Sequence, residues 1–158
     1  MARATPATSA LNRQGIAFEL VAYDYEPGPG RVALQAAAAL GVAPAEVFKT
    51  LMVLVDGQPV CAVVPADAEL NLKKLAAAVG GRSARMMPPV EAERLTGYRV
   101  GGISPFGQRR SVPTVFDTRA LAHARIYLNG GQRGLQLRVA PADAIAAAAA
   151  ATADLARG

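Results

Sequence analysis

Cysteine and histidine each occur once in the 158-residue chain, and tryptophan does not occur at all. Cys61 and His123 cannot together supply a Cys/His zinc site, a disulfide framework, or a Ser-His-Asp or Cys-His catalytic unit with a histidine to spare. No metal and no cofactor is therefore expected, and any catalysis must use other groups. Cys61 lies in the apolar run 60–64, which is typical of a small buried core residue.

Long apolar runs are also missing. No stretch reaches the roughly 18 apolar residues that a transmembrane helix needs, and residues 1–6 lack the apolar core of a signal peptide. We therefore expect a cytoplasmic protein with no membrane partner. A length of 158 residues is close to the usual size of one domain, so the sequence predicts a single domain over residues 1–158.

Positive charge is concentrated in the middle of the chain. Residues 71–140 carry 12 basic and 3 acidic side chains, whereas residues 1–70 carry 4 basic and 7 acidic ones. Such a basic segment suits a phosphate backbone. It is equally compatible with a solvated face in an arginine-biased composition, because arginine outnumbers lysine 14 to 3.

Capping and turn signals divide the chain into short elements. Helices are predicted at 6–14, 31–40, 71–79, 89–95 and 141–155, and strands at 18–23, 47–55, 59–64, 112–116, 124–128 and 135–139. Loops are predicted at 26–30 and 96–108. Helices interspersed with hairpins in this order favour an α+β fold with a mixed sheet.

Lys49 interrupts the predicted strand 47–55, in which every other residue except Thr50 is apolar. Strand alternation places Lys49 on the same face as Leu51 and Val53. An unpaired buried ammonium is costly, so the side chain must reach a cleft or a counter-charge. The alternative is a lysine near the strand end that extends to solvent.

Two glycine-rich segments are further candidates. In residues 97–107, the consecutive Gly101 and Gly102 can expose backbone N–H groups that hold an anion or a developing oxyanion. As a bare pattern the segment is more often a turn than a site, and Ser104 has no base in sequence reach that could activate it. Residues 129–136 are typical of a glycine-rich hairpin.

Four segments together resemble the YbaK/EbsC family, the free-standing relatives of the editing domain of bacterial prolyl-tRNA synthetases. They are Phe-Lys-Thr-Leu at 48–51, Leu-Asn-Leu-Lys-Lys-Leu at 70–75, Thr-Gly-Tyr-Arg-Val-Gly-Gly-Ile-Ser-Pro at 96–105 and Tyr-Leu-Asn-Gly-Gly-Gln-Arg-Gly-Leu at 127–135. The resemblance extends from about residue 11 to residue 155. It implies a mixed, barrel-like β-sheet flanked by helices and a trans-editing aminoacyl-tRNA deacylase, with the cysteinyl-tRNA(Pro) branch most similar.

The resemblance also implies a set of site residues. The catalytic positions fall on Lys49, Gly101 and Gly102. The substrate-binding positions fall on Tyr23, Thr50, Ile103, Ser104, Pro105, Asn129, Gly130 and Gln136. The cysteine-specific branch usually has a small hydroxyl residue and an acidic residue where this chain has Asn129 and Gln136.

In the cysteine branch, the thiol of the substrate is thought to attack its own ester carbonyl, and the protein supplies positioning and oxyanion stabilisation. The implied partner is the acceptor end of a mischarged tRNA, with prolyl-tRNA synthetase as a second partner and with no DNA. Two alternatives stay open. One is a hydrolytic deacylase for another small aminoacyl group such as alanyl, and the other is a non-catalytic module that binds tRNA or a synthetase.

Overall fold

The computed structural model describes residues 4–26 and 32–157. The helices are α1 (Pro6–Arg13), α2 (Val32–Leu40), α3 (Leu72–Ala78), α4 (Pro89–Thr96) and α5 (Pro141–Ala147), with short 3-10 helices η1 (Pro44–Glu46) and η2 (Thr118–Ala122). The strands are β1 (Glu19–Ala22), β2 (Phe48–Val55), β3 (Gln58–Pro65), β4 (Ala84–Met86), β5 (Thr114–Asp117), β6 (Ile126–Gln132), β7 (Leu135–Val139) and β8 (Ala151–Ala153). The predicted α+β class is confirmed. None of the helices in the described ranges is long and apolar enough to cross a membrane.

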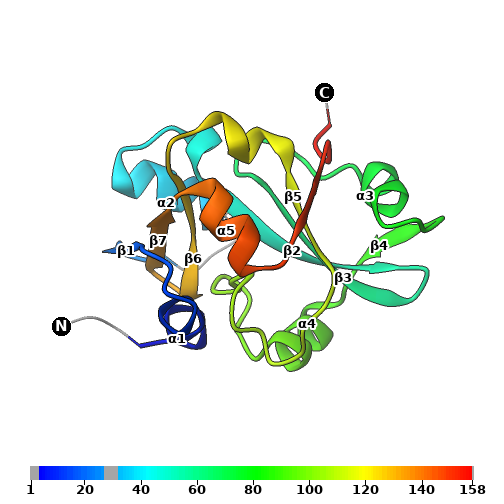
Figure 1. Cartoon of the computed structure of the whole chain (residues 1–158), viewed down its shortest axis with the longest axis horizontal. Helices are drawn as coiled ribbons and strands as arrows, with labels where there is room; N and C mark the ends of the chain where they lie inside the picture. The colour runs from blue at the N-terminus through cyan, green and yellow to red at the C-terminus, as the bar shows by residue number, and fades with distance from the viewer. Residues whose placement is uncertain (1–3, 27–31, 158) are drawn as a thin grey trace.

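The strands form two open sheets, so the expected barrel-like closure is not found. One sheet has the order β1-β7-β6 and the other has the order β4-β2-β3-β5-β8. An isolated parallel bridge between Val47 and Tyr127 joins them. In Figure 1 the smaller sheet lies at the left, and the β2–β3 hairpin extends to the right.

The β2–β3 hairpin follows the sequence prediction closely. Its turn contains Asp56 and Gly57, both with positive φ (49° and 80°), as the twist of a two-residue hairpin turn requires. Alternate residues of β2 then face opposite sides of the sheet. Met52 belongs to the core that the two sheets share, whereas Val53 belongs to a second core, which includes Leu75 of α3.

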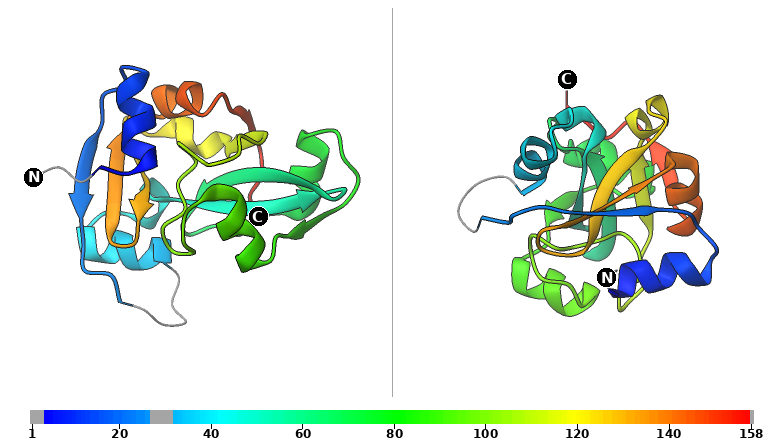
Figure 2. Two further views of the ribbon diagram at one scale, coloured as in Figure 1. Left: turned by 90° about the horizontal axis from the view of Figure 1, so that it is seen from below. Right: turned by 90° about the vertical axis from the view of Figure 1, so that its left-hand side faces the viewer.

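Helix α1 is fixed to the smaller sheet by its N-cap. Thr5 accepts a hydrogen bond from the Thr8 N–H (3.1 Å), and its hydroxyl donates to the Gly130 carbonyl (2.6 Å). The buried Ala7 and Leu11 pack into the shared core. Both views of Figure 2 show α1 beside this sheet.

The final predicted helix, 141–155, is wrong in its second half. α5 ends at Ala147, and β8 pairs in parallel with β5. Alanine favours helix, but the chain reverses through Ala149, which has φ +49°, so that β8 can complete the larger sheet. Pairing within the fold has therefore overridden local propensity.

Smaller differences affect the strands. β4 was not predicted, because its three residues carry no strand alternation. β6 continues to Gln132 instead of ending at Leu128, with a bulge between Asn129 and Gln132. Residues 27–30 of the predicted loop 26–30, and Arg31 at the predicted start of a helix, lie outside the described residues.

Asp117 holds the C-terminal segment against the larger sheet. Its fully buried carboxylate accepts hydrogen bonds from the N–H groups of Leu155 (2.8 Å), Ala156 (3.0 Å) and Arg119 (2.8 Å). The Arg119 guanidinium is 3.2 Å away and supplies the opposite charge. Such a charge is tolerated in the core because several donors surround it.

Asp117→Ala is expected to lower the free energy of unfolding by about 3 kcal/mol, because it leaves buried N–H groups unpaired. Urea denaturation measures the change. The matched control is Asp154→Asn, which removes an exposed carboxylate that pairs with Lys74 (2.8 Å) and should leave the denaturation midpoint almost unchanged. Equal midpoint shifts in the two variants would contradict this role for Asp117.

Candidate active site

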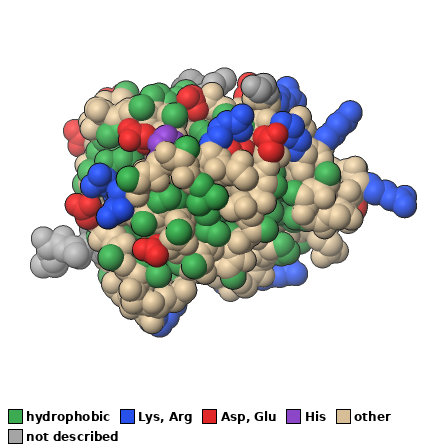
Figure 3. Space-filling model, turned by 45° about the horizontal axis from the view of Figure 1, so that its top comes forward, with side chains coloured by type: hydrophobic (Ala, Val, Ile, Leu, Met, Phe, Trp, Pro, Cys, Tyr) green, Lys and Arg blue, Asp and Glu red, His purple; other side chains and the backbone are tan. Residues whose placement is uncertain are grey.

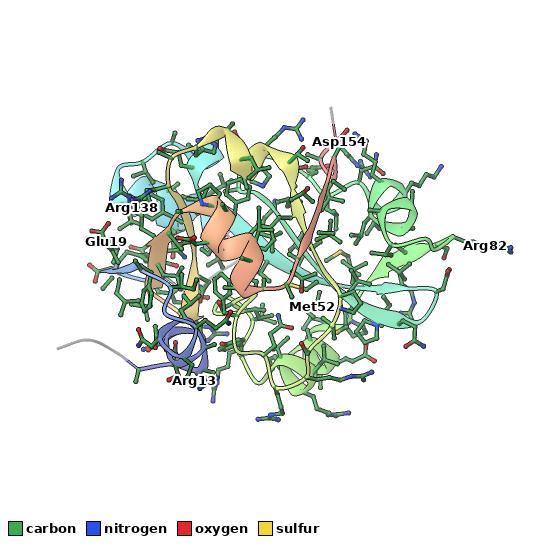
Figure 4. The ribbon with its side chains drawn as sticks, in the orientation of Figure 1. Arg13, Glu19, Met52, Arg82, Arg138 and Asp154 are labelled. Atoms are coloured by element: carbon green, nitrogen blue, oxygen red, sulfur yellow. The ribbon has the colours of Figure 1, made fainter. Side chains whose placement is uncertain are left out.

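A cavity of about 410 Å³ opens along the edge of β2. β4 pairs with residues 53–55 of β2, and the Met87 N–H donates to the Met52 carbonyl (3.1 Å), so among the described strands none continues this pairing along the edge of residues 48–51. Met52 lies near the centre of the molecule (Figure 4). The described residues that line the cavity are Val32, Ala33, Phe48, Lys49, Thr50, Leu51, Met52, Ala66, Met86, Met87, Pro89, Ala92, Val100, Gly101, Ile103, Asn129 and Gln136.

Six of the residues singled out in the sequence meet at this cavity although they come from distant segments. They are Lys49, Thr50, Gly101, Ile103, Asn129 and Gln136. Lys49 is half-buried and is the one titratable side chain among the described lining residues. The rest of the lining is mainly apolar, which is typical of a small-molecule site with a few placed polar groups.

Gly101 and Gly102 form part of a tight turn. The Gly102 N–H donates to the Arg99 carbonyl (2.8 Å), so this donor is already used within the turn. Gly101 has φ +94°, which requires glycine, and its N–H makes no hydrogen bond with the described residues. Of the two N–H groups considered for an oxyanion, the one on Gly101 is available in this conformation.

Gly102 also lets two backbones approach closely. A Cβ at this position would lie 2.9 Å from the Arg133 nitrogen and 3.0 Å from the Gln132 carbonyl carbon. The turn therefore packs directly on the end of β6, where a side chain would not fit. This packing brings the 96–105 and 127–135 segments together.

Asn129 connects the turn to β6 through its carboxamide. Its Nδ2 donates to the Gly101 carbonyl (3.1 Å), and its Oδ1 accepts from the N–H groups of Gly131 (2.7 Å) and Gln132 (3.1 Å). These bonds also hold the bulge in β6. The polar atoms of Asn129 are thus occupied by backbone, although the residue lines the cavity.

Gln136 pairs with Asn129 across the β6–β7 ladder and is almost fully buried. Within the described part of the chain, neither its Oε1 nor the Oγ1 of Thr50 has a hydrogen-bond partner. Buried polar atoms are nearly always paired, so two unpaired ones that belong to lining residues indicate a ligand with hydrogen-bonding groups. Both atoms can accept a hydrogen bond from a donor group of such a ligand.

Five predicted site residues lie away from the described lining, and Gly102 of the turn described above is one of them. Ser104 and Pro105 are buried behind the turn, where the Ser104 hydroxyl accepts from the Phe106 N–H (3.3 Å). Gly130 accepts the bond from Thr5. Tyr23 is bonded through its N–H to the Gly134 carbonyl (2.9 Å), and burial raises the pKa of its hydroxyl.

Sequence reasoning missed the contribution of Met86, Met87 and Arg133. The two methionines line the cavity beside β2, and no motif marks them. Arg133 belongs to the basic segment and to the glycine-rich segment 129–136, but no separate role was predicted for it, and its Nε donates to the Val100 carbonyl (2.9 Å). Its place within the Asn-Gly-Gly-Gln-Arg-Gly segment was the one available signal.

Cys61 and His123, the single cysteine and the single histidine of the sequence, both contribute to packing. Cys61 is fully buried, and burial raises the pKa of its thiol to about 12. The His123 ring packs edge-on against Phe48, with ring centres 6.3 Å apart. Among the described residues, no group of three or more His, Cys, Asp or Glu side chains could hold a metal ion.

The basic segment does not form one continuous face. Arg82 and Arg138 lie at opposite ends of the molecule (Figure 4), and Arg138 pairs with Glu19 (3.0 Å). On the face shown in Figure 3, basic and acidic side chains are interspersed with hydrophobic ones. Any nucleic-acid contact must therefore use a subset of the arginines.

Comparison with known proteins gives consistent matches. A family model for the aminoacyl-tRNA editing domain matches residues 28–147. EbsC of Enterococcus faecalis, named as a candidate Cys-tRNA(Pro)/Cys-tRNA(Cys) deacylase, is 39% identical over 106 residues, which are 66% of this chain and 65% of EbsC. A proline-tRNA ligase of Acidithiobacillus ferrooxidans is 39% identical over 98 residues, which are 62% of this chain and 17% of the ligase. A crystal structure described as a candidate trans-editing enzyme for prolyl-tRNA synthetase has a TM-score of 0.85 at 27% identity, covering 99% of this chain and 100% of that one.

Cys61 is expected to resist alkylation in the folded protein. A shift of the thiol pKa from 9.0 to about 12 lowers the thiolate fraction at neutral pH about a thousandfold, and burial also blocks access. Mass spectrometry after iodoacetamide treatment should detect fast labelling in urea and almost none under native conditions. Similar labelling rates in the two states would show that Cys61 is accessible.

Proposed function

The chain belongs to the YbaK/EbsC family of aminoacyl-tRNA editing domains, and we propose that it is a trans-editing deacylase that removes cysteine from cysteinyl-tRNA(Pro). The fold and the family support ester cleavage on a mischarged tRNA. The cysteine preference is suggested by the identity with EbsC over 106 residues. The proposed mechanism rests on the residues that line the cavity.

One observation carries the proposal: the described lining contains a lysine and a glycine turn, but no cysteine, histidine or carboxylate. Such a site can bind and polarise an ester. It offers no cysteine, histidine or carboxylate as nucleophile or general base, and none of these groups lies in the described lining to activate the Thr50 hydroxyl. The nucleophile must therefore come from the substrate or from water.

A cysteinyl ester brings its own nucleophile. Its sulfur attacks the ester carbonyl carbon, a C–S bond forms, and the bond from that carbon to the ribose oxygen breaks. The thiol proton ends on the ribose hydroxyl, so the products are free tRNA and a cyclic thiolactone of cysteine. The protein then needs only to orient the thiol and to stabilise the negative charge on the carbonyl oxygen.

Lys49 and Gly101 are the groups proposed to stabilise this charge. The Lys49 ammonium approaches from the edge of β2 and contacts the ester oxygen or the 3′-terminal phosphate. The Gly101 N–H donates to the carbonyl oxygen as it becomes negative. Both act in a mainly apolar cavity, where electrostatic interactions are stronger than in water.

Gln136 and Thr50 are proposed to bind the aminoacyl group itself. Their unpaired oxygens accept hydrogen bonds from its ammonium or side chain. Because Gln136 is neutral, the amino-acid subsite carries no negative charge. This neutrality is the observation that favours the second candidate, hydrolysis of an alanyl or other small aminoacyl ester by water.

The proposed partner is the acceptor end of tRNA, with prolyl-tRNA synthetase as a second partner in the cytoplasm. The synthetase connection is supported by the match with proline-tRNA ligase. Arg99 and Arg133 lie beside the turn at Gly101, and both are exposed. Binding through phosphate contacts weakens with rising salt.

Lys49→Ala is expected to lower single-turnover deacylation of Cys-tRNA(Pro) by at least about a hundredfold, because it removes the one positive charge of the described lining. The circular dichroism spectrum and the melting temperature should stay close to those of the wild type. The matched control is Lys73→Ala, which removes an exposed lysine of α3 and should retain full activity. Full activity of Lys49→Ala would refute the assignment.

The amino acid removed is tested with three esters on the same tRNA(Pro): cysteinyl, seryl and alanyl. Thiol attack predicts that the cysteinyl ester is cleaved at least about tenfold faster than the seryl ester, because a hydroxyl is the weaker nucleophile. Mass spectrometry should detect the thiolactone itself, because its hydrolysis product, free cysteine, is also the product of direct ester hydrolysis. Faster cleavage of the alanyl ester would establish the hydrolytic alternative, and no turnover of any ester would indicate a binding module.

A further inference from the structure

The turn that presents the Gly101 N–H has two possible orientations of its central peptide. Gly102 bonds to Arg99, and Gly101 at the third position has φ +94°, which identifies a type II turn. Type I and type II turns differ by a flip of the peptide between the second and third residues. Here that peptide joins Val100 to Gly101, so a flip would reverse the N–H proposed to stabilise the oxyanion.

Arg133 binds the carbonyl of this peptide, on the side opposite to the Gly101 N–H. Its Nε donates to the Val100 carbonyl (2.9 Å), and the described chain contains no cis peptide bonds. In a trans peptide the carbonyl and the following N–H point in opposite directions. The bond from Arg133 therefore fixes the Gly101 N–H in the direction away from Arg133.

Neighbouring groups hold the rest of the turn. Glu93 accepts from the Val100 N–H (2.9 Å), and Asn129 donates to the Gly101 carbonyl (3.1 Å). Arg133 is itself oriented by Tyr25, since its guanidinium lies 5.5 Å from the centre of the Tyr25 ring. A Cβ on Gly101 would lie 3.1 Å from the Tyr25 hydroxyl and 3.2 Å from Arg133 Nε, so both side chains pack closely on the turn.

We propose that Arg133 is a positioning residue that locks the Val100–Gly101 peptide in the orientation in which its N–H serves the reaction. This inference rests on the proposed function, because it assigns a role to the Gly101 N–H. Arg133 lies in the exposed connection between β6 and β7. One hydrogen bond from such a side chain contributes little to global stability, but it acts directly on the orientation of the turn.

The competing role for Arg133 is an ordinary contact with a tRNA phosphate. The two roles use different parts of the side chain. Positioning needs an N–H donor at the place of Nε, whereas phosphate binding needs the positive charge. Glutamine places its Nε2 where arginine has Nε, one bond beyond Cδ, and it carries no charge. Methionine is similar in length and has neither donor nor charge.

Single-turnover deacylation of Cys-tRNA(Pro) by the full chain separates the two roles. Arg133→Met is expected to lower the maximal rate constant about tenfold and to leave the half-saturating protein concentration within about twofold. Arg133→Gln should restore the rate constant to within about threefold of the wild type. The matched control is Arg13→Met, which removes an exposed arginine from the last turn of α1, outside the described lining of the cavity, and should not change either parameter.

Two kinetic results would overturn the proposal. One is an unchanged rate constant in Arg133→Met. The other is a higher half-saturating concentration and a shallower salt dependence in both Arg133 variants, which would establish a phosphate contact. An inactive wild type would refute the proposed function instead. The conformation of the turn is followed independently of activity by the ¹⁵N–¹H resonance of Gly101. This resonance should shift in Arg133→Met and return toward the wild-type position in Arg133→Gln. An unshifted resonance in Arg133→Met would refute the lock.

Discussion

The candidate active site depends on the hydrogen bonds of one buried carboxamide. Asn129 holds the bulge of β6 through its Oδ1 and holds the Gly101 carbonyl through its Nδ2. These bonds act together with the close packing of Gly102 on the end of β6. With them, the turn faces the edge of β2, and Lys49 and Gly101 line the same cavity.

The resulting site is defined by backbone geometry more than by reactive side chains. Glycine at 101 and 102 allows the turn and its close packing on β6. The cavity is mainly apolar, with Lys49 as the one titratable group of its described lining and with unpaired oxygens on Thr50 and Gln136. A site of this kind suits a substrate that is already activated, such as an aminoacyl ester, and that can bring its own nucleophile.

Much of this organisation could be predicted from the sequence, because local signals and fold agreed. The β2–β3 hairpin follows from its apolar run and Asp-Gly turn, and six site residues identified through the motifs meet at the cavity. The strand β8 could not be predicted, since alanine at 151 and 153 favours helix and only β5 provides the alternative. The role of Asn129 could not be predicted either, because a sequence does not show that a polar side chain forms a hydrogen bond with a backbone carbonyl 28 residues away.

The central claim is that the turn at 99–102 and the edge of β2 together bind the aminoacyl end of tRNA. It is tested most directly by NMR titration of the ¹⁵N-labelled chain with a non-hydrolysable cysteinyl-amide analogue of the terminal adenosine. The largest shifts are expected at the amides of Gly101 and Ile103 and at the carboxamide of Gln136. Shifts confined to the separate cavity lined by Arg119 and His123, with Gly101 unchanged, would contradict the assignment of the site.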